Sequence, residues 1–217
     1  MKFKHLSLTT FLALVPFFVY PTNGNQYNQN NTKLYWQDVQ TVAVNKEYPR
    51  TSFMTFASRN EALSRKFEES QFYQSLNGVW KFYFVDGYND LPANITDPAV
   101  STTNWNDIIV PGNWEMQGFG IPIYTNHGYE FKPRDPQPPI LPEMNPVGVY
   151  RRDIDIPSEW MNRDIFLHIA GAKSGMYVYI NGEEVGYSED SKNSAEFLIN
   201  DYVKPGKNTL VLKIFRW

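Results

Sequence analysis

The chain has 217 residues, of which 42% are hydrophobic and 16% aromatic, and its formal net charge is −3. This is enough material for one large all-β domain or two small ones. Lysine and arginine are scattered, so the charge pattern suggests no nucleic-acid partner and no anionic membrane partner. There is no cysteine, and the three histidines are not spaced as metal ligands are. Disulfides and thiol nucleophiles are therefore excluded, and metal catalysis by these residues is not expected.

Residues 1–24 are predicted to be a signal peptide. Lys2 and Lys4 precede a mostly apolar run, Leu6 to Tyr20, that Pro16 interrupts. This run is too short and too broken to span a bilayer comfortably, which takes about 20 apolar residues. An N-terminal membrane anchor is the alternative. The sequence therefore predicts export, to the periplasm or beyond the cell, with no membrane association after signal cleavage. Residues 25–33 are rich in Asn and Gln and predict a tether without a core.

The remaining residues, 34–217, are predicted to form one β-rich domain. Residues 60–67 have the spacing of a short surface helix. Alternation of apolar and polar residues predicts strands over 79–85, 150–156, 165–169, 176–180, 185–187 and 210–214. Short strands with turns between them and little helix indicate an all-β, antiparallel β-sandwich, and we favour a jelly roll.

A long irregular stretch, Val110 to Pro146, interrupts the strand pattern. It holds eight prolines, which exclude a regular strand or helix of any length. Its aromatic residues argue against disorder. A loop stiffened by proline loses little entropy on binding a ligand, so a binding role is one interpretation. Packing over the sandwich for structural reasons is the other.

The segment from Gly171 to Phe197 predicts a β-hairpin followed by a polar loop. Asn181-Gly182 supplies the two positive-φ positions of a type I′ turn. The return strand runs into Ser188–Ser194, a loop without an apolar residue that carries Asp190 near its middle. A firm hairpin can present this carboxylate to a ligand. The alternative is a loop whose charges are only solvated.

The sequence ends at Phe215-Arg216-Trp217, within a predicted strand. Domains commonly end in a few loosely ordered residues. We therefore expect the domain to be C-terminally incomplete.

Five motifs occur in order between Leu76 and Ser191. They are Leu76-Asn77-Gly78-Val79-Trp80-Lys81-Phe82, Val110-Pro111-Gly112-Asn113-Trp114-Glu115-Met116-Gln117-Gly118-Phe119-Gly120, Pro122-Ile123-Tyr124-Thr125-Asn126, Asn145-Pro146-Val147-Gly148-Val149-Tyr150-Arg151-Arg152 and Gly186-Tyr187-Ser188-Glu189-Asp190-Ser191. In this order and spacing they resemble the family-two glycoside hydrolases of the β-galactosidase type. The resemblance implies the N-terminal sugar-binding domain of a longer enzyme, with a galactose-binding-domain-like jelly roll. It also implies that the catalytic glutamates and any magnesium site belong to a barrel beyond residue 217. No catalytic residue is assigned to this chain.

Two residues carry over from the family as substrate ligands. The resemblance implies that Asn126 and Asp190 hydrogen-bond the hydroxyls of a β-galactoside, and that Asp190 is also a metal ligand that helps to hold a sodium ion. The side chains suit these roles. A carboxylate accepts charge-assisted hydrogen bonds, and an amide both donates and accepts.

Three functions follow as hypotheses. The first is the N-terminal segment of an exported, retaining β-galactosidase, with the β-galactoside and the downstream domains of the enzyme as partners. The second is a free-standing, non-catalytic carbohydrate-binding module. The third is a truncation product that exposes an unpaired domain interface and aggregates.

Overall fold

The computed structural model describes residues 34–64, 66–126, 141 and 144–217. The predicted signal peptide and tether, and most of the second half of the proline-rich stretch, lie outside these ranges. Nine strands are described: β1 Ala43–Val44, β2 Gly78–Val85, β3 Asn106–Val110, β4 Val147–Ile156, β5 Phe166–Ile169, β6 Met176–Ile180, β7 Glu183–Ser188, β8 Ala195–Leu198 and β9 Gly206–Phe215. The helical elements are α1, Arg59–Ser64, and five 3-10 turns at Tyr35–Gln37, Phe67–Glu69, Tyr88–Asp90, Trp114–Gln117 and Ser158–Trp160.

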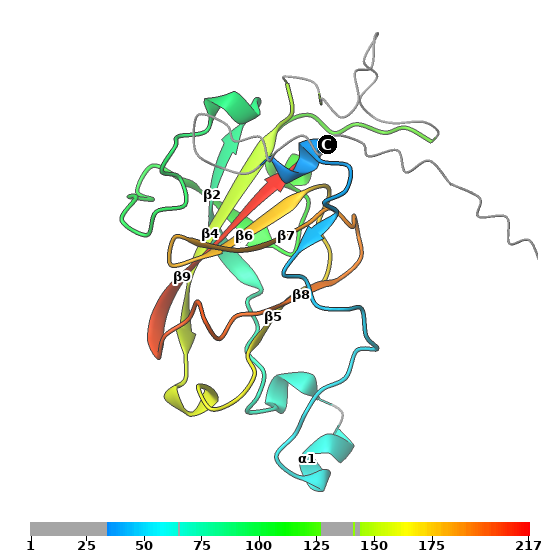
Figure 1. Ribbon diagram of the computed structural model, residues 1–217, viewed down its shortest axis with the longest axis vertical. Helices are drawn as coiled ribbons and strands as arrows, with labels where there is room; N and C mark the ends of the chain where they lie inside the picture. The colour runs from blue at the N-terminus through cyan, green and yellow to red at the C-terminus, as the bar shows by residue number, and fades with distance from the viewer. Residues whose placement is uncertain (1–33, 65, 127–140, 142–143) are drawn as a thin grey trace, which may run out of the picture.

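The strands form two antiparallel sheets (Figure 1). Seven strands lie in the order β1-β7-β6-β9-β4-β2-β3, and β5 pairs with β8 in a second, two-stranded sheet. The predicted all-β, antiparallel jelly-roll sandwich is confirmed, with sheets of unequal size. The short surface helix is confirmed as α1, whose residues are not buried. Within the described ranges, no helix has the length and apolar character needed to cross a bilayer.

One face of the large sheet packs against the small sheet. The core between them contains Phe82, Val178 and Leu212 from the large sheet, and Leu167 and Phe197 from the small one. These residues occupy alternate positions of their strands, as the period of two requires. The predicted alternation of apolar residues therefore identified this core.

The other face of the large sheet is also buried. Tyr177, Tyr179 and Val211 pack there against Tyr35 and Trp105, which come from segments outside the sheet. All five residues of β6 are consequently buried. This second layer was not predicted. An alternation of tyrosine with aliphatic residues fits a strand with one buried face as well as a strand with two.

The β6–β7 hairpin forms as predicted. Asn181 and Gly182 have φ values of 53° and 88°, which fit the type I′ turn. The Asn181 side chain also donates to the Tyr202 carbonyl at 2.9 Å. A register shift between Val178 and Tyr179 bends the hairpin.

One end of the large sheet collects several chain segments. Val147 at the start of β4 pairs with Phe215 at the end of β9, and Met176 at the start of β6 pairs with Ser188 at the end of β7. The loops that leave these four strand ends must therefore lie at the same end of the sheet. The polar loop with Asp190 is one of them.

Candidate functional site

The polar loop after β7 is held by hydrogen bonds rather than by apolar packing. At its start, the Glu189 amide donates to the Val42 carbonyl at 3.2 Å. The buried Tyr187 hydroxyl donates to the Glu189 carboxylate at 2.9 Å. These two bonds fix the backbone immediately before Asp190.

The segment before β6 supports the other side of this loop. The Lys192 amide donates to the Ala172 carbonyl at 2.9 Å, and the hydroxyls of Ser174 and Ser191 lie 3.2 Å apart. A side chain at Gly171 would crowd the Lys192 carbonyl, because an added Cβ would come within 3.2 Å of that oxygen. The loop is therefore anchored both before and after Asp190.

Asp190 has a partner on each carboxylate oxygen. The Asn193 amide donates to Oδ1 at 2.8 Å, and the Lys46 ammonium lies 3.1 Å from Oδ2. The Asn193 hydrogen bond, followed by Lys46, lowers the pKa of Asp190 below its usual value. The side chain remains 46% exposed, so an ionised acceptor faces solvent.

Lys46 reaches Asp190 through β1. This two-residue strand pairs with the end of β7, matching Ala43 with Ser188 and Val44 with Tyr187. Asn45 then turns the chain with a φ of 52°, and its side-chain amide donates to the Val185 carbonyl at 2.9 Å. Sequence reasoning missed Lys46, which lies 144 positions from Asp190 and in none of the five motifs.

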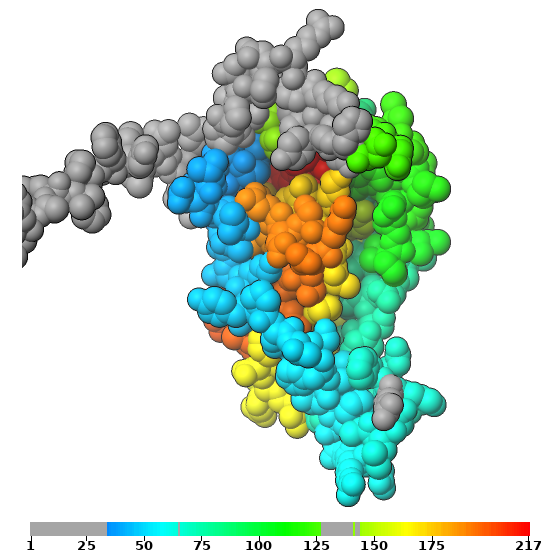
Figure 2. Space-filling view, turned by 90° about the vertical axis from the view of Figure 1, so that its right-hand side faces the viewer, coloured from blue at the N-terminus to red at the C-terminus, as the bar shows by residue number. Residues whose placement is uncertain are grey.

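Asn126 is exposed and is the last described residue before 127–140. Its segment approaches the end of β9, where the Arg216 guanidinium donates to the Ile121 carbonyl at 2.8 Å. Figure 2 shows the orange surface of the β7 region between the blue N-terminal segment and the green 110–126 region, on one face of the molecule. The segments that carry Asn126 and Asp190 thus share one end of the sheet and one face. His127 lies outside the described residues.

Three glutamates of the described ranges, Glu115, Glu189 and Glu196, have structural partners. Glu115 pairs with Arg216 at 3.5 Å, and Glu196 pairs with Arg50 at 2.9 Å and contacts the His168 ring at 2.9 Å. Glu189 accepts from Tyr187, as described above. Glu130 and Glu143 lie outside the described residues.

The described surroundings of Asp190 do not fit a sodium ion on this carboxylate. A hard cation takes several oxygen ligands, whereas Asp190 already shares one lone pair of Oδ2 with an ammonium and one of Oδ1 with an amide N–H. Among the described residues, no group of three or more His, Asp or Glu side chains is placed to hold a metal. The sodium role of Asp190 stays a prediction that this geometry does not support.

Replacing Gly186 by Ala is expected to destabilise the fold by about 1–3 kcal/mol, the usual cost of overpacking. An added Cβ would overlap the Val44 carbonyl oxygen and lie 2.8 Å from the Phe197 ring. The substitution therefore forces β1 away from β7. Urea unfolding measures the loss, and the exposed Val79→Ala variant is the control. A Gly186→Ala protein as stable as the control would contradict the close packing of β1.

A sequence model described as "Glycosyl hydrolases family 2, sugar binding domain" matches residues 73–217. The β-galactosidase of Priestia megaterium is 36% identical over 199 residues, which cover 91% of this chain and 19% of that protein. The β-galactosidase of Lactococcus lactis is 43% identical over 148 residues, or 66% of this chain and 14% of that protein. The chain spans about a fifth of the length of these curated relatives.

Solved structures with similar backbones include β-glucuronidases. That of Bifidobacterium dentium has a TM-score of 0.47 and 20% identity, covering 64% of this chain and 19% of that one. That of Bacteroides uniformis has a TM-score of 0.47 and 22% identity, covering 66% of this chain and 14% of that one. The family match covers well over half of the sequence, and it includes the strands that carry the Asp190 loop. The chain belongs to glycoside hydrolase family 2, of which it contains the sugar-binding domain.

Proposed function

We propose that this chain is the substrate-binding, N-terminal part of an exported, retaining β-galactosidase. It supplies Asn126 and Asp190 to a sugar site, and the catalytic glutamates lie in polypeptide outside this chain. Its partners are a β-galactoside and the downstream domains of the enzyme. Support comes from the β-galactosidase relatives, which are about five to seven times as long as the matched region. Export rests on the predicted signal peptide, residues 1–24.

The observation that carries the proposal is the anchored, ionised Asp190 at the end of the sheet. Hydrogen bonds on both sides hold its loop, so little freedom is lost when a ligand binds. A carboxylate offers about four lone-pair sites, of which Asn193 and Lys46 use two. The remaining sites can accept hydrogen bonds from sugar hydroxyls.

The sequence relatives favour a galactoside rather than a glucuronide as the substrate. Both of the relatives described above are β-galactosidases.

The proposed division of labour fits the chemistry of retaining glycosidases. Two carboxyl groups about 5–5.5 Å apart perform the double displacement, one as nucleophile and one as acid and base. Glu115, Glu189 and Glu196 are engaged in the contacts described above. Asn126 and Asp190 would instead bind hydroxyls, and such hydrogen bonds strengthen in the transition state.

In the whole protein, Asp190→Asn is expected to lower kcat/KM for a chromogenic galactoside about 10- to 100-fold, the usual worth of a hydrogen bond to a charged group. Asn126→Ala should lower it in the same direction. The 217-residue chain alone should not hydrolyse the substrate. Asp107→Asn is the matched control, because Asp107 is an exposed carboxylate paired with Lys81 on the distant β2–β3 edge. Unchanged activity in Asp190→Asn, or turnover by the chain alone, would overturn the proposal.

The free-standing carbohydrate-binding module remains the second candidate. The matched family description, a sugar-binding domain, is the observation that favours it. Calorimetry of the 217-residue chain with galactose or lactose separates the two: a millimolar or tighter affinity without any downstream domain supports the module.

A further inference from the structure

We propose that the Lys46 ammonium is the built-in cation of the Asp190 site, so that this carboxylate is positioned without a bound alkali ion. Lys46 is thus a positioning residue. Its consequence for sugar binding rests on the proposed function, whereas the ion pair itself does not.

The two partners of the ion pair differ in exposure. The side chain of Lys46 is 10% exposed and that of Asp190 is 46% exposed, with 3.1 Å between Nζ and Oδ2. A lysine side chain that is largely buried has few places for its ammonium, and here the ammonium lies on Asp190. Lys46 is therefore the fixed member of the pair, and it determines where Asp190 can lie.

The backbone on both sides of Lys46 is fixed as well. Before it, β1 pairs with β7, and the Asn45 amide donates to the Val185 carbonyl at 2.9 Å. After it, the Glu47 amide donates at 2.9 Å to the carbonyl of Glu196, which lies in β8 of the small sheet. Lys46 thus lies on a segment tied to both sheets, directly beside the Asp190 loop.

A second cation at the same oxygen would face the ammonium at close range. Like charges within a few ångströms repel strongly where water is partly excluded. A sodium ion on the open lone pair of Oδ2 would share that oxygen with the ammonium. The Lys46 ammonium already supplies the positive charge that an alkali ion would bring to Asp190. One lone pair on each Asp190 oxygen stays open to hydroxyl donors.

The first test measures the effect of Lys46 on the loop. Hydrogen exchange of the amides of residues 189–194 is followed in the 217-residue chain for wild type, Lys46→Met and Lys46→Arg. We expect Lys46→Met to speed exchange about tenfold, the effect of losing roughly 1.4 kcal/mol of local stability, and Lys46→Arg to retain most of the protection. Lys81→Met is the matched control, since it removes an exposed lysine from the Lys81–Asp107 pair. Exchange in Lys46→Met no faster than in the control would overturn the proposal, whereas the Lys46→Arg result shows that the chain still folds.

The second test replaces NaCl by KCl at equal ionic strength and measures the thermal unfolding midpoint and the ²³Na linewidth. Wild type is expected to show no sodium-specific change. A sodium effect in wild type that Asp190→Asn abolishes would overturn the proposal. The proposed function fails separately: if Asp190→Asn leaves galactoside hydrolysis by the whole protein unchanged, the sugar role is wrong, whatever the exchange and sodium measurements show.

Discussion

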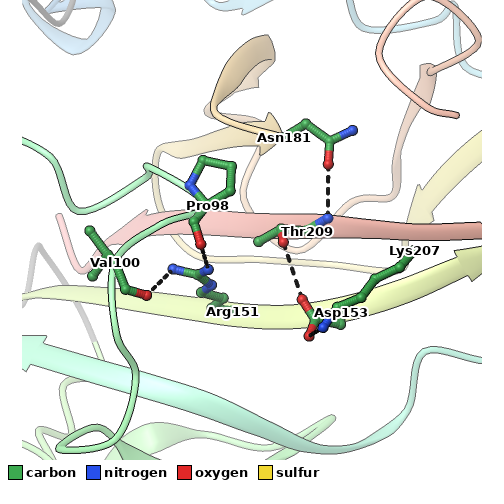
Figure 3. Close-up of polar contacts among 7 residues, drawn as sticks. All are labelled: Pro98, Val100, Arg151, Asp153, Asn181, Lys207 and Thr209. Atoms are coloured by element: carbon green, nitrogen blue, oxygen red, sulfur yellow. Dashed lines mark hydrogen bonds and ion pairs between the residues drawn. The ribbon is translucent and has the colours of Figure 1, made fainter.

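Replacing Arg151 by Met is expected to destabilise the fold by at least about 3 kcal/mol, because three carbonyl oxygens in partly buried hydrogen bonds would each lose a donor at a cost of about 1–3 kcal/mol. Arg151 lies on β4 and is only 8% exposed. Its guanidinium donates to the carbonyls of Val100 at 2.9 Å and Pro98 at 2.5 Å (Figure 3). It also donates to the Asp97 carbonyl at 3.1 Å. Methionine removes these donors and leaves carbonyl oxygens without their hydrogen bonds.

Urea unfolding followed by circular dichroism measures this loss. Lys207→Met is the matched control, because Lys207 is an exposed cation that pairs at 2.8 Å with Asp153, a residue of β4 like Arg151. Exposed pairs contribute about 0–1 kcal/mol, so the control should lose little stability. Equal losses in the two variants would show that Arg151 does not hold the segment around residues 97–100.

Replacing Lys213 by Met is expected to remove a pH dependence of the unfolding free energy. Lys213 lies in β9 and is 3% exposed, with its Nζ 4.6 Å from the ring centre of Tyr177 and 5.4 Å from that of Tyr179. Burial lowers the pKa of Lys213 from 10.5 to about 8, although Glu184 opposes this change. The folded state therefore releases the proton at a lower pH than the unfolded state does.

The sign follows from the number of bound protons. Between pH 8 and 10 the unfolded chain holds more protons at this position, so stability rises with pH. The difference between 10.5 and about 8 corresponds to about 3 kcal/mol if it is fully developed. Burial also raises the pKa of Tyr177, Tyr179 and Tyr187, which stay neutral in the fold, so stability falls again above about pH 10, where tyrosines of the unfolded chain ionise.

Unfolding free energies measured from pH 7 to 10 test this prediction. Wild type should gain stability over this range, and Lys213→Met should lack the gain and be more stable than wild type at pH 7. Lys207→Met is the matched control, because it removes an exposed lysine from β9, the strand that also carries Lys213. This variant should keep the wild-type profile. A wild type whose stability does not rise above pH 8 would show that Lys213 keeps its charge in the core.

Local sequence patterns predicted most of the strands. Trp80 and Phe82 on β2, and Leu210 and Leu212 on β9, are buried on one face, as their alternation indicated. The hairpin was predictable because Asn181-Gly182 has the backbone freedom that its turn needs. These features depend on neighbours within a few residues, so they can be recognised without a structure.

The surroundings of Asp190 were not predictable in this way. The sequence predicted a polar loop after β7, but its supports come from the Ala172–Ser174 segment and from Lys46. The burial of Arg151 and Lys213 was not predictable either. Each occupies a polar position of an alternating strand, and in a sheet with one solvated face such a position is exposed.

The sequence by itself determined the strand pattern, the hairpin turn and, through five motifs in order, the family that the comparison confirmed. Only the tertiary structure decided that both faces of the large sheet are covered and that Lys46 lies on Asp190. The physical reason is the range of the interactions. Alternation and turn preference act between neighbouring residues, whereas an ion pair that joins residues 144 positions apart exists only after β1 has paired with β7.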